Sequence, residues 1–226
     1  MASLFSEFIY RPILNLTVFI YSFVGFGDLG IAIIIMTIVI RLIFSPLSLK
    51  ASRSQKQLAT LAPEVEKIKA KFPSDKAVQS QEIMKLYKER KVSPLAGCLP
   101  LLIQFPILLG MYRVFLNIYK PESLANLYSF IPHPTSINPT LLGLIDISQR
   151  NIAFALMAGA TQFIQAKLAA GNQPQAGQAA ALNKQMLYLF PVMITVISWN
   201  LPAGLALYWI ITTLFSIGEQ LYLRRR

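Results

Sequence analysis

The sequence predicts an all-α integral membrane protein with five transmembrane helices, a cytoplasmic helical hairpin and an N-terminal amphipathic helix in the membrane interface. Three observations lead to this fold class. Of the 226 residues, 54% are hydrophobic and only 14% are charged, whereas about 25% of the residues in an average soluble domain are charged. The apolar residues gather in long runs, as in helices that cross a bilayer. The basic residues are concentrated between these runs.

Five runs have the apolar character of membrane spans. They are Leu29–Leu49, Leu95–Ile118, Ile152–Leu168, Leu187–Leu201 and Ala203–Tyr222. A spanning helix needs about 20 apolar residues, so the third and fourth runs are short, and short spans thin the bilayer locally or sit within a bundle. We therefore expect residues 28–50 to form the first transmembrane helix. Residues 94–226 hold four more, with short loops and a basic tail.

Residues 1–27 show a different pattern, that of an amphipathic helix. Apolar side chains recur at helical spacing, and polar ones fill the other face; the apolar set is Phe5, Phe8, Ile9, Pro12, Ile13 and Leu16, and the polar set is Ser6, Glu7, Tyr10, Arg11 and Asn15. Such a helix is suited to lying in the membrane interface. A short span from Pro12 to Phe26 is the alternative.

The distribution of lysine and arginine predicts the orientation, because cytoplasmic loops of membrane proteins carry an excess of both. Residues 51–93 hold ten of them: Arg53, Lys56, Lys67, Lys69, Lys71, Lys76, Lys85, Lys88, Arg90 and Lys91. The connection after the second span holds only Lys120 and Arg150. We therefore place residues 51–93, the Lys167–Lys184 loop and the C-terminus in the cytoplasm.

The large basic loop is predicted to fold as an antiparallel helical hairpin. One apolar seam recurs at steps of three and four residues through Leu58, Leu61, Val65, Ile68 and Phe72, and a weaker one follows through Ile83, Leu86 and Tyr87. Pro73 interrupts the pattern, and either Ser74 or Asp75 can cap the second helix. The low-complexity stretch from Ala169 to Ala181 is expected to be a flexible linker.

Several classes of function are disfavoured. The single cysteine, Cys98, excludes a disulfide within the chain, and the single histidine, His133, leaves no plausible zinc cluster. No phosphate-binding loop or nucleophile motif appears, so we expect no enzyme activity, cofactor or metal. The net charge of +11 fits the orientation bias and attraction to anionic lipids, rather than sequence-specific binding of nucleic acid.

Arg41 is the most informative residue of the sequence. It lies about 12 residues, or roughly 18 Å, inside the first predicted span. A charge at that depth costs several kcal/mol unless it is paired or hydrated, which makes it a candidate functional residue. The alternative is that its side chain reaches the cytoplasmic headgroups.

Other polar side chains are predicted at a similar depth. Gln104 lies in the second span and Thr37 one helical turn before Arg41, while the third span adds Thr161, Gln162 and Gln165. Together they predict a shared hydrated cavity that opens to the cytoplasm, although glutamine and threonine also commonly bond between helices. Tyr208 and Trp209 lie well inside the fifth span, and by their position alone they are interpreted as packing aromatics.

Three long strings resemble the YidC-type membrane protein insertases. They are TIVIRLIFSPLSLKASRSQKQL, EIMKLYKERKVSPLAGCLPLLIQFPILLGMYRVF and WNLPAGLALYWIITTLFSIGEQ, and the resemblance covers roughly residues 30–221. It implies a five-helix core in a bacterial-type plasma membrane, with a positively charged groove open to cytoplasm and lipid. By position, Arg41 matches the groove arginine of the family, and Thr37, Gln104 and Trp209 match positions that line the groove or contact the client.

The resemblance also implies a function and its partners. The family inserts the transmembrane segments and short polar tails of client membrane proteins, alone or with the Sec translocon, and the ribosome is a further partner. A client-binding groove of Arg41, Thr37, Gln104, Trp209, Gln162 and Gln165 is therefore expected. A transporter or channel for small solutes or anions is the alternative, because the same cavity could pass them.

Overall fold

The computed structural model describes residues 2–93, 99–170 and 177–225 of the chain. Four features discussed above fall wholly or partly elsewhere. The expected start of the second span at Leu95, the lone Cys98, residues 171–176 of the expected linker and the terminal Arg226 lie outside the described residues.

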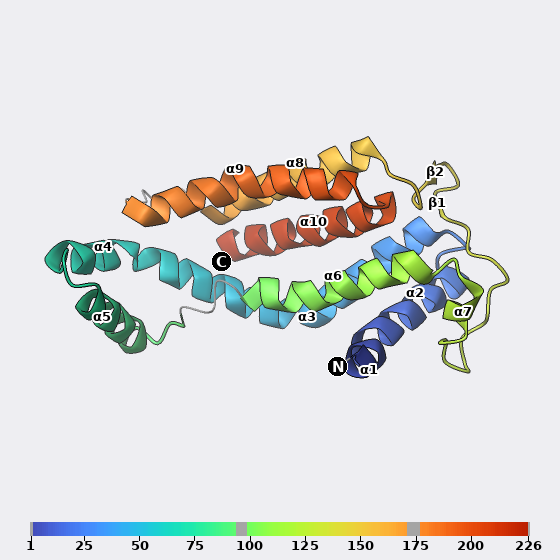
Figure 1. Ribbon diagram of the computed structural model, residues 1–226, viewed down its shortest axis with the longest axis horizontal. Helices are drawn as coiled ribbons and strands as arrows, with labels where there is room; N and C mark the ends of the chain where they lie inside the picture. The colour runs from blue at the N-terminus through green and yellow to red at the C-terminus, as the bar shows by residue number, and fades with distance from the viewer. Residues whose placement is uncertain (1, 94–98, 171–176, 226) are drawn as a thin grey trace.

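Five long helices form a bundle whose members run alongside one another (Figure 1). They are α3 (Leu29–Thr60), α6 (Leu99–Asn117), α8 (Ile152–Ala170), α9 (Gly177–Trp199) and α10 (Ala203–Arg225). The α8 and α9 helices pack against each other, and α10 packs against both α8 and α3. We call the end with helices α4 and α5 the hairpin end, and the opposite end, with strands β1 and β2, the loop end.

The helices agree with the predicted spans at several boundaries and extend past others. The α8 helix begins at the expected Ile152, and α10 begins at the expected Ala203. The α3 helix does not end at Leu49 but continues to Thr60 with Pro46 inside it. The Lys56 Nζ atom donates a hydrogen bond to the Leu223 carbonyl oxygen at 3.1 Å, so this continuation stays attached to α10.

The α9 helix begins ten residues before the predicted Leu187, so the stretch expected to be flexible is helical from Gly177 onward. Alanines 179–181 lie in this first part, and alanine is the best helix former. The apolar stretch of α9 is nevertheless the short one, Leu187–Trp199. Within the described residues, Leu29–Thr60 and Ile152–Ala169 are long and apolar enough to cross a membrane by themselves. The count of five spans therefore stays a prediction.

The outer surface of the bundle is apolar. On α9 the exposed side chains include Tyr188, Leu189, Val192, Val196 and Ile197, and α3 and α6 likewise expose leucine, isoleucine and phenylalanine. Soluble monomers rarely expose contiguous apolar patches larger than a few hundred Å². This surface is typical of a protein surrounded by acyl chains.

The N-terminal segment is helical and packs against the bundle. It consists of α1 (Ala2–Phe5), a π-helix η1 (Ser6–Tyr10) and α2 (Arg11–Phe23), which contact α3 and α6. The predicted division into faces is wrong at Asn15, which is only 2% exposed. Its side chain accepts a hydrogen bond from the Tyr128 backbone nitrogen at 2.6 Å and donates one to the Asn126 carbonyl at 3.2 Å. A polar residue is buried here because the loop after α6 supplies its partners.

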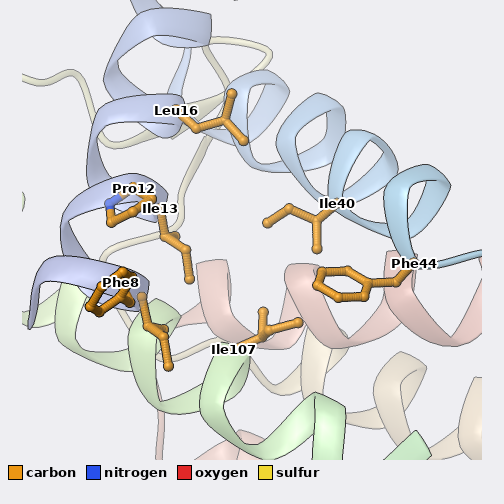
Figure 2. Close-up of a pocket in the computed structure, with 8 residues that line it drawn as sticks. Phe8, Pro12, Ile13, Leu16, Ile40, Phe44 and Ile107 are labelled. Atoms are coloured by element: carbon orange, nitrogen blue, oxygen red, sulfur yellow. The ribbon is translucent and has the colours of Figure 1, made fainter. Parts of the chain in front are cut away.

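An apolar pocket of about 210 Å³ lies where the N-terminal helix meets α3 and α6 (Figure 2). Its lining residues are Phe8, Ile9, Pro12, Ile13 and Leu16 from the N-terminal helix, Ile40 and Phe44 from α3, and Ile107 from α6. Phe8, expected on the apolar face, is one of these lining residues and is largely exposed. Whether the N-terminal helix lies in a membrane interface stays a prediction.

At the hairpin end, α4 (Ala62–Lys71) and α5 (Lys76–Glu89) pack against each other. Asp75 caps α5, because its carboxylate accepts from the Ala77 and Val78 backbone nitrogens at 3.0 Å. Arg90 pairs with Glu64 at 3.0 Å. The predicted apolar seam divides between two helices, since Leu58 belongs to α3 and Val65 to α4. The position of this hairpin in the cytoplasm stays a prediction.

The loop end contains an element that an all-α fold does not include. After α7 (Pro121–Leu124), strands β1 (Thr140–Leu141) and β2 (Ile145–Asp146) pair in antiparallel register. Asp28 attaches the β1–β2 pair to the bundle. Its carboxylate caps α3 by accepting a hydrogen bond from the Ile31 backbone nitrogen at 2.8 Å, and it accepts another from the Gly143 backbone nitrogen at 3.2 Å. Strands of two residues are too short for a period-two pattern to reveal in the sequence.

Candidate functional site

Arg41, on α3, belongs to a hydrogen-bond network that includes residues of two other helices. Its Nη2 atom donates a hydrogen bond to Gln104 Oε1 on α6 at 3.4 Å, and Gln104 Nε2 donates to the Tyr208 hydroxyl on α10 at 2.6 Å. Tyr208 is only 2% exposed, and Arg41 and Gln104 are partly buried. We call these three residues the Arg41 network.

Arg41 has no carboxylate partner within 4.0 Å among the described residues. The three ion pairs formed in this part of the chain are Glu7–Arg11, Glu66–Lys69 and Glu64–Arg90, and all lie outside the five bundle helices. A guanidinium has five N–H donors, and a single hydrogen bond at 3.4 Å leaves most of them available. The network therefore offers a positive charge with donors to spare, which suits an incoming carboxylate.

A second network joins α10 to α8. The Trp209 indole nitrogen donates to Gln162 Oε1 at 3.1 Å, and Gln162 Nε2 donates to Gln165 Oε1 at 2.7 Å. We call these residues the Trp209 network. Tyr208 and Trp209 are neighbours in α10, so one helix connects both networks: Tyr208 bonds toward α6, and Trp209 bonds toward α8.

The structure thus brings together five of the six predicted site residues, in two groups. Thr37 is the sixth predicted residue, and it joins neither group. It is 0% exposed, and its hydroxyl donates to the Ile33 carbonyl oxygen of its own helix at 2.6 Å. It lies one helical turn from Arg41, behind the network rather than within it. Thr161 is likewise bonded within its own helix, to the Met157 carbonyl oxygen at 2.9 Å.

Tyr208 is a network member that the sequence interpretation missed. It was expected to be a packing aromatic, and its ring is indeed buried. A buried tyrosine hydroxyl, however, usually finds a hydrogen-bond partner. The signal was therefore available: a tyrosine far from either end of an apolar span needs a polar residue on a neighbouring helix, and Gln104 was the candidate at that depth.

Two polar stripes lead from the Arg41 network toward the hairpin end. On α3 the stripe is Arg41, Ser45, Ser48 and Ser52, and on α10 it is Tyr208, Thr212, Ser216 and Glu219, with steps of three or four residues that place each set on one helix face. Ser48 Oγ donates to Glu219 Oε1 at 2.5 Å. Farther along both helices, Lys56 bonds to Leu223. Residue numbers therefore increase in the same direction along the two helices, so α3 and α10 run parallel.

The apolar pocket is a separate feature on another side of α3. Ile40 and Phe44 line it, although they flank Arg41 closely in sequence, and Arg41 is absent from its lining (Figure 2). Among the residues that the structure describes, no three His, Cys, Asp or Glu side chains gather as metal ligands. The chemistry of the site is therefore that of one cation, amides and hydroxyls inside an apolar bundle.

The family model described as "60Kd inner membrane protein" matches residues 19–226, which include all five bundle helices and both networks. The chain belongs to the 60Kd inner membrane protein family. Membership identifies it as a bacterial inner membrane protein and explains the exposed apolar surface of the bundle.

Individual relatives of this family are similar over most of the chain. A protein of Fusobacterium nucleatum named "Membrane protein insertase YidC" is 37% identical over 202 residues, which cover 88% of each chain. Proteins with the same name from Lawsonia intracellularis and Oleidesulfovibrio alaskensis are 34% and 35% identical over 96% and 97% of this chain. The chain spans only 38% and 39% of the length of these two relatives.

Proposed function

We propose that this protein inserts client membrane proteins into the bilayer, and that the Arg41 and Trp209 networks line the path of the client. The relatives named as insertases support the activity. The observation that carries the role of the site is Arg41, a partly buried cation inside an apolar bundle, held by Gln104 and without an ion pair in the described chain.

The mechanism that follows lowers the cost of moving polar groups into a membrane. A charge that enters the bilayer unaided loses its water, at several kcal/mol for each charge. The stripes on α3 and α10 would let water and a client tail reach Arg41 from the hairpin end. Arg41 would then attract a carboxylate of that tail, while the amides of the Trp209 network accept and donate hydrogen bonds to its backbone.

The client would leave sideways into lipid, along a hydrated groove between α3, α8 and α10, rather than through a sealed channel. The short apolar stretch of α9 supports a locally thinner bilayer beside this route. The basic residues of α4 and α5 support a cytoplasmic location of the hairpin end, where it would first meet the client or the ribosome. The Sec translocon and anionic lipids are further partners under this proposal.

The decisive experiment uses liposomes that contain only this protein. A client with one transmembrane segment and a short acidic tail is synthesised outside the liposomes, and protease protection of the tail measures insertion. We expect protection well above that of protein-free liposomes. The same vesicles carry an anionic dye to test the transporter alternative: release of the dye without protection of the tail would overturn the proposal in favour of solute transport.

A further inference from the structure

Glu219 is the one acidic residue that the sequence places within the five bundle helices, the other nine being in the N-terminal segment, the hairpin and the loops. It lies on the polar stripe of α10 and is partly buried. Its Oε1 atom accepts a hydrogen bond from Ser48 Oγ at 2.5 Å. A hydrogen bond from a neutral hydroxyl holds the carboxylate in place without adding a positive charge beside it.

The position of Glu219 relative to Arg41 follows from its partner. Ser48 lies seven residues after Arg41, about 10 Å along the same face of α3, on the hairpin side. Opposite charges attract across such a distance, so the Glu219 carboxylate and the Arg41 guanidinium interact. A segment that reaches Arg41 along the stripes from the hairpin end therefore passes this carboxylate first.

Two basic side chains near the end of α10 donate hydrogen bonds to backbone oxygens. Lys56 donates to the Leu223 carbonyl oxygen at 3.1 Å, and Arg224 donates to the Leu168 carbonyl oxygen at 2.5 Å. These bonds tie the end of α10 to α3 and to α8, and they direct the Lys56 and Arg224 donor groups to backbone oxygens. Among the described residues, neither forms an ion pair with Glu219.

We infer that Glu219, held by Ser48, is a specificity-determining residue that disfavours client tails with several acidic residues relative to neutral tails. This inference rests on the proposed insertase function and names the class of client that the same site prefers. Arg41 can attract one carboxylate, whereas a carboxylate that follows it along the stripes comes past Glu219. Like charges brought together at an interface act mainly against the wrong partner, which is a specificity effect.

The test compares two clients that differ only in the tail, one with three aspartates and the other with three asparagines at the same positions. The readout is the ratio of their insertion into liposomes containing the wild-type protein or Glu219→Gln. The glutamine oxygen can still accept from Ser48, so the variant removes charge and keeps shape. We expect the acidic-to-neutral ratio to rise about threefold to tenfold.

Ser48→Ala is the matched control, because it removes the hydrogen bond and keeps the charge. We expect its acidic-to-neutral ratio to stay nearer to that of the wild type than to that of Glu219→Gln. An unchanged ratio in Glu219→Gln, a parallel loss of both clients, or an equal ratio in the two variants would overturn the inference. Insertion of neither client by the wild type would instead reject the proposed function, on which this inference depends.

Discussion

Replacing Arg41 by alanine is expected to reduce insertion of a client with an acidic tail about tenfold, whereas Arg41→Lys should retain much of the activity. Two opposite charges 4 Å apart attract by about 4 kcal/mol at the effective dielectric constant of a protein surface, and water in the site lowers this value. A remaining difference of about 1.4 kcal/mol corresponds to a factor of ten. The measurement is protease protection of the tail in liposomes.

Arg113→Ala serves as the control for charge alone. Arg113 is exposed on α6 toward the loop end and stacks over the Phe5 ring at 5.0 Å, away from both networks. Its loss changes the net charge by the same amount, and we expect insertion to remain close to that of the wild type. Equal effects of the two alanine variants would show that net charge, rather than the place of Arg41, determines insertion.

Gly204→Ala is expected to lower the stability of the helix bundle. A Cβ atom at this position would lie 2.1 Å from Phe115 Cε1 and 2.3 Å from Cζ. Phe115 is only 4% exposed, so its ring has little room to move. Overpacking of this kind typically costs about 1–3 kcal/mol. A lower Tm of the purified protein in detergent would show the loss.

Gly218→Ala on the same helix provides the opposite case. A Cβ atom there has no neighbour within 4 Å, and alanine stabilises a helix interior by about 1 kcal/mol relative to glycine. We therefore expect the Tm of Gly218→Ala to equal or exceed that of the wild type. A Tm for Gly204→Ala as high as that of Gly218→Ala would contradict the close approach of α10 and α6.

The sequence allowed the depth of polar residues to be predicted, but not their partners. Counting residues from the ends of the spans predicted that Arg41 and Gln104 lie at a similar depth. The two side chains indeed form a hydrogen bond. The rotation of each helix about its axis depends on packing with its neighbours, which an almost uniformly apolar helix does not encode by periodicity. For this reason the bond of Tyr208 to Gln104 was missed, and so was the bond of Thr37 within its own helix.

The helix boundaries differ for a related reason. Lys50 and the polar residues after it mark the end of the apolar run, yet the first glycine or proline after them is Pro63, and α3 continues to Thr60. The point at which the chain leaves the apolar layer need not be the point at which the helix ends. Amino-acid composition indicates only where the chain leaves the layer. The buried Asn15 and the β1–β2 hairpin depend on contacts between distant segments, which local patterns do not reveal.

Photo-crosslinking of a stalled client tests the central claim, that the client passes along the two networks. A photoreactive side chain is placed at Gln104 or Trp209, which belong to the networks, and at Phe105, which follows Gln104 in α6 but is 57% exposed on the apolar surface. We expect adducts with the client from positions 104 and 209 and few from position 105. Adducts from position 105 alone, with none from positions 104 and 209, would contradict the proposed path.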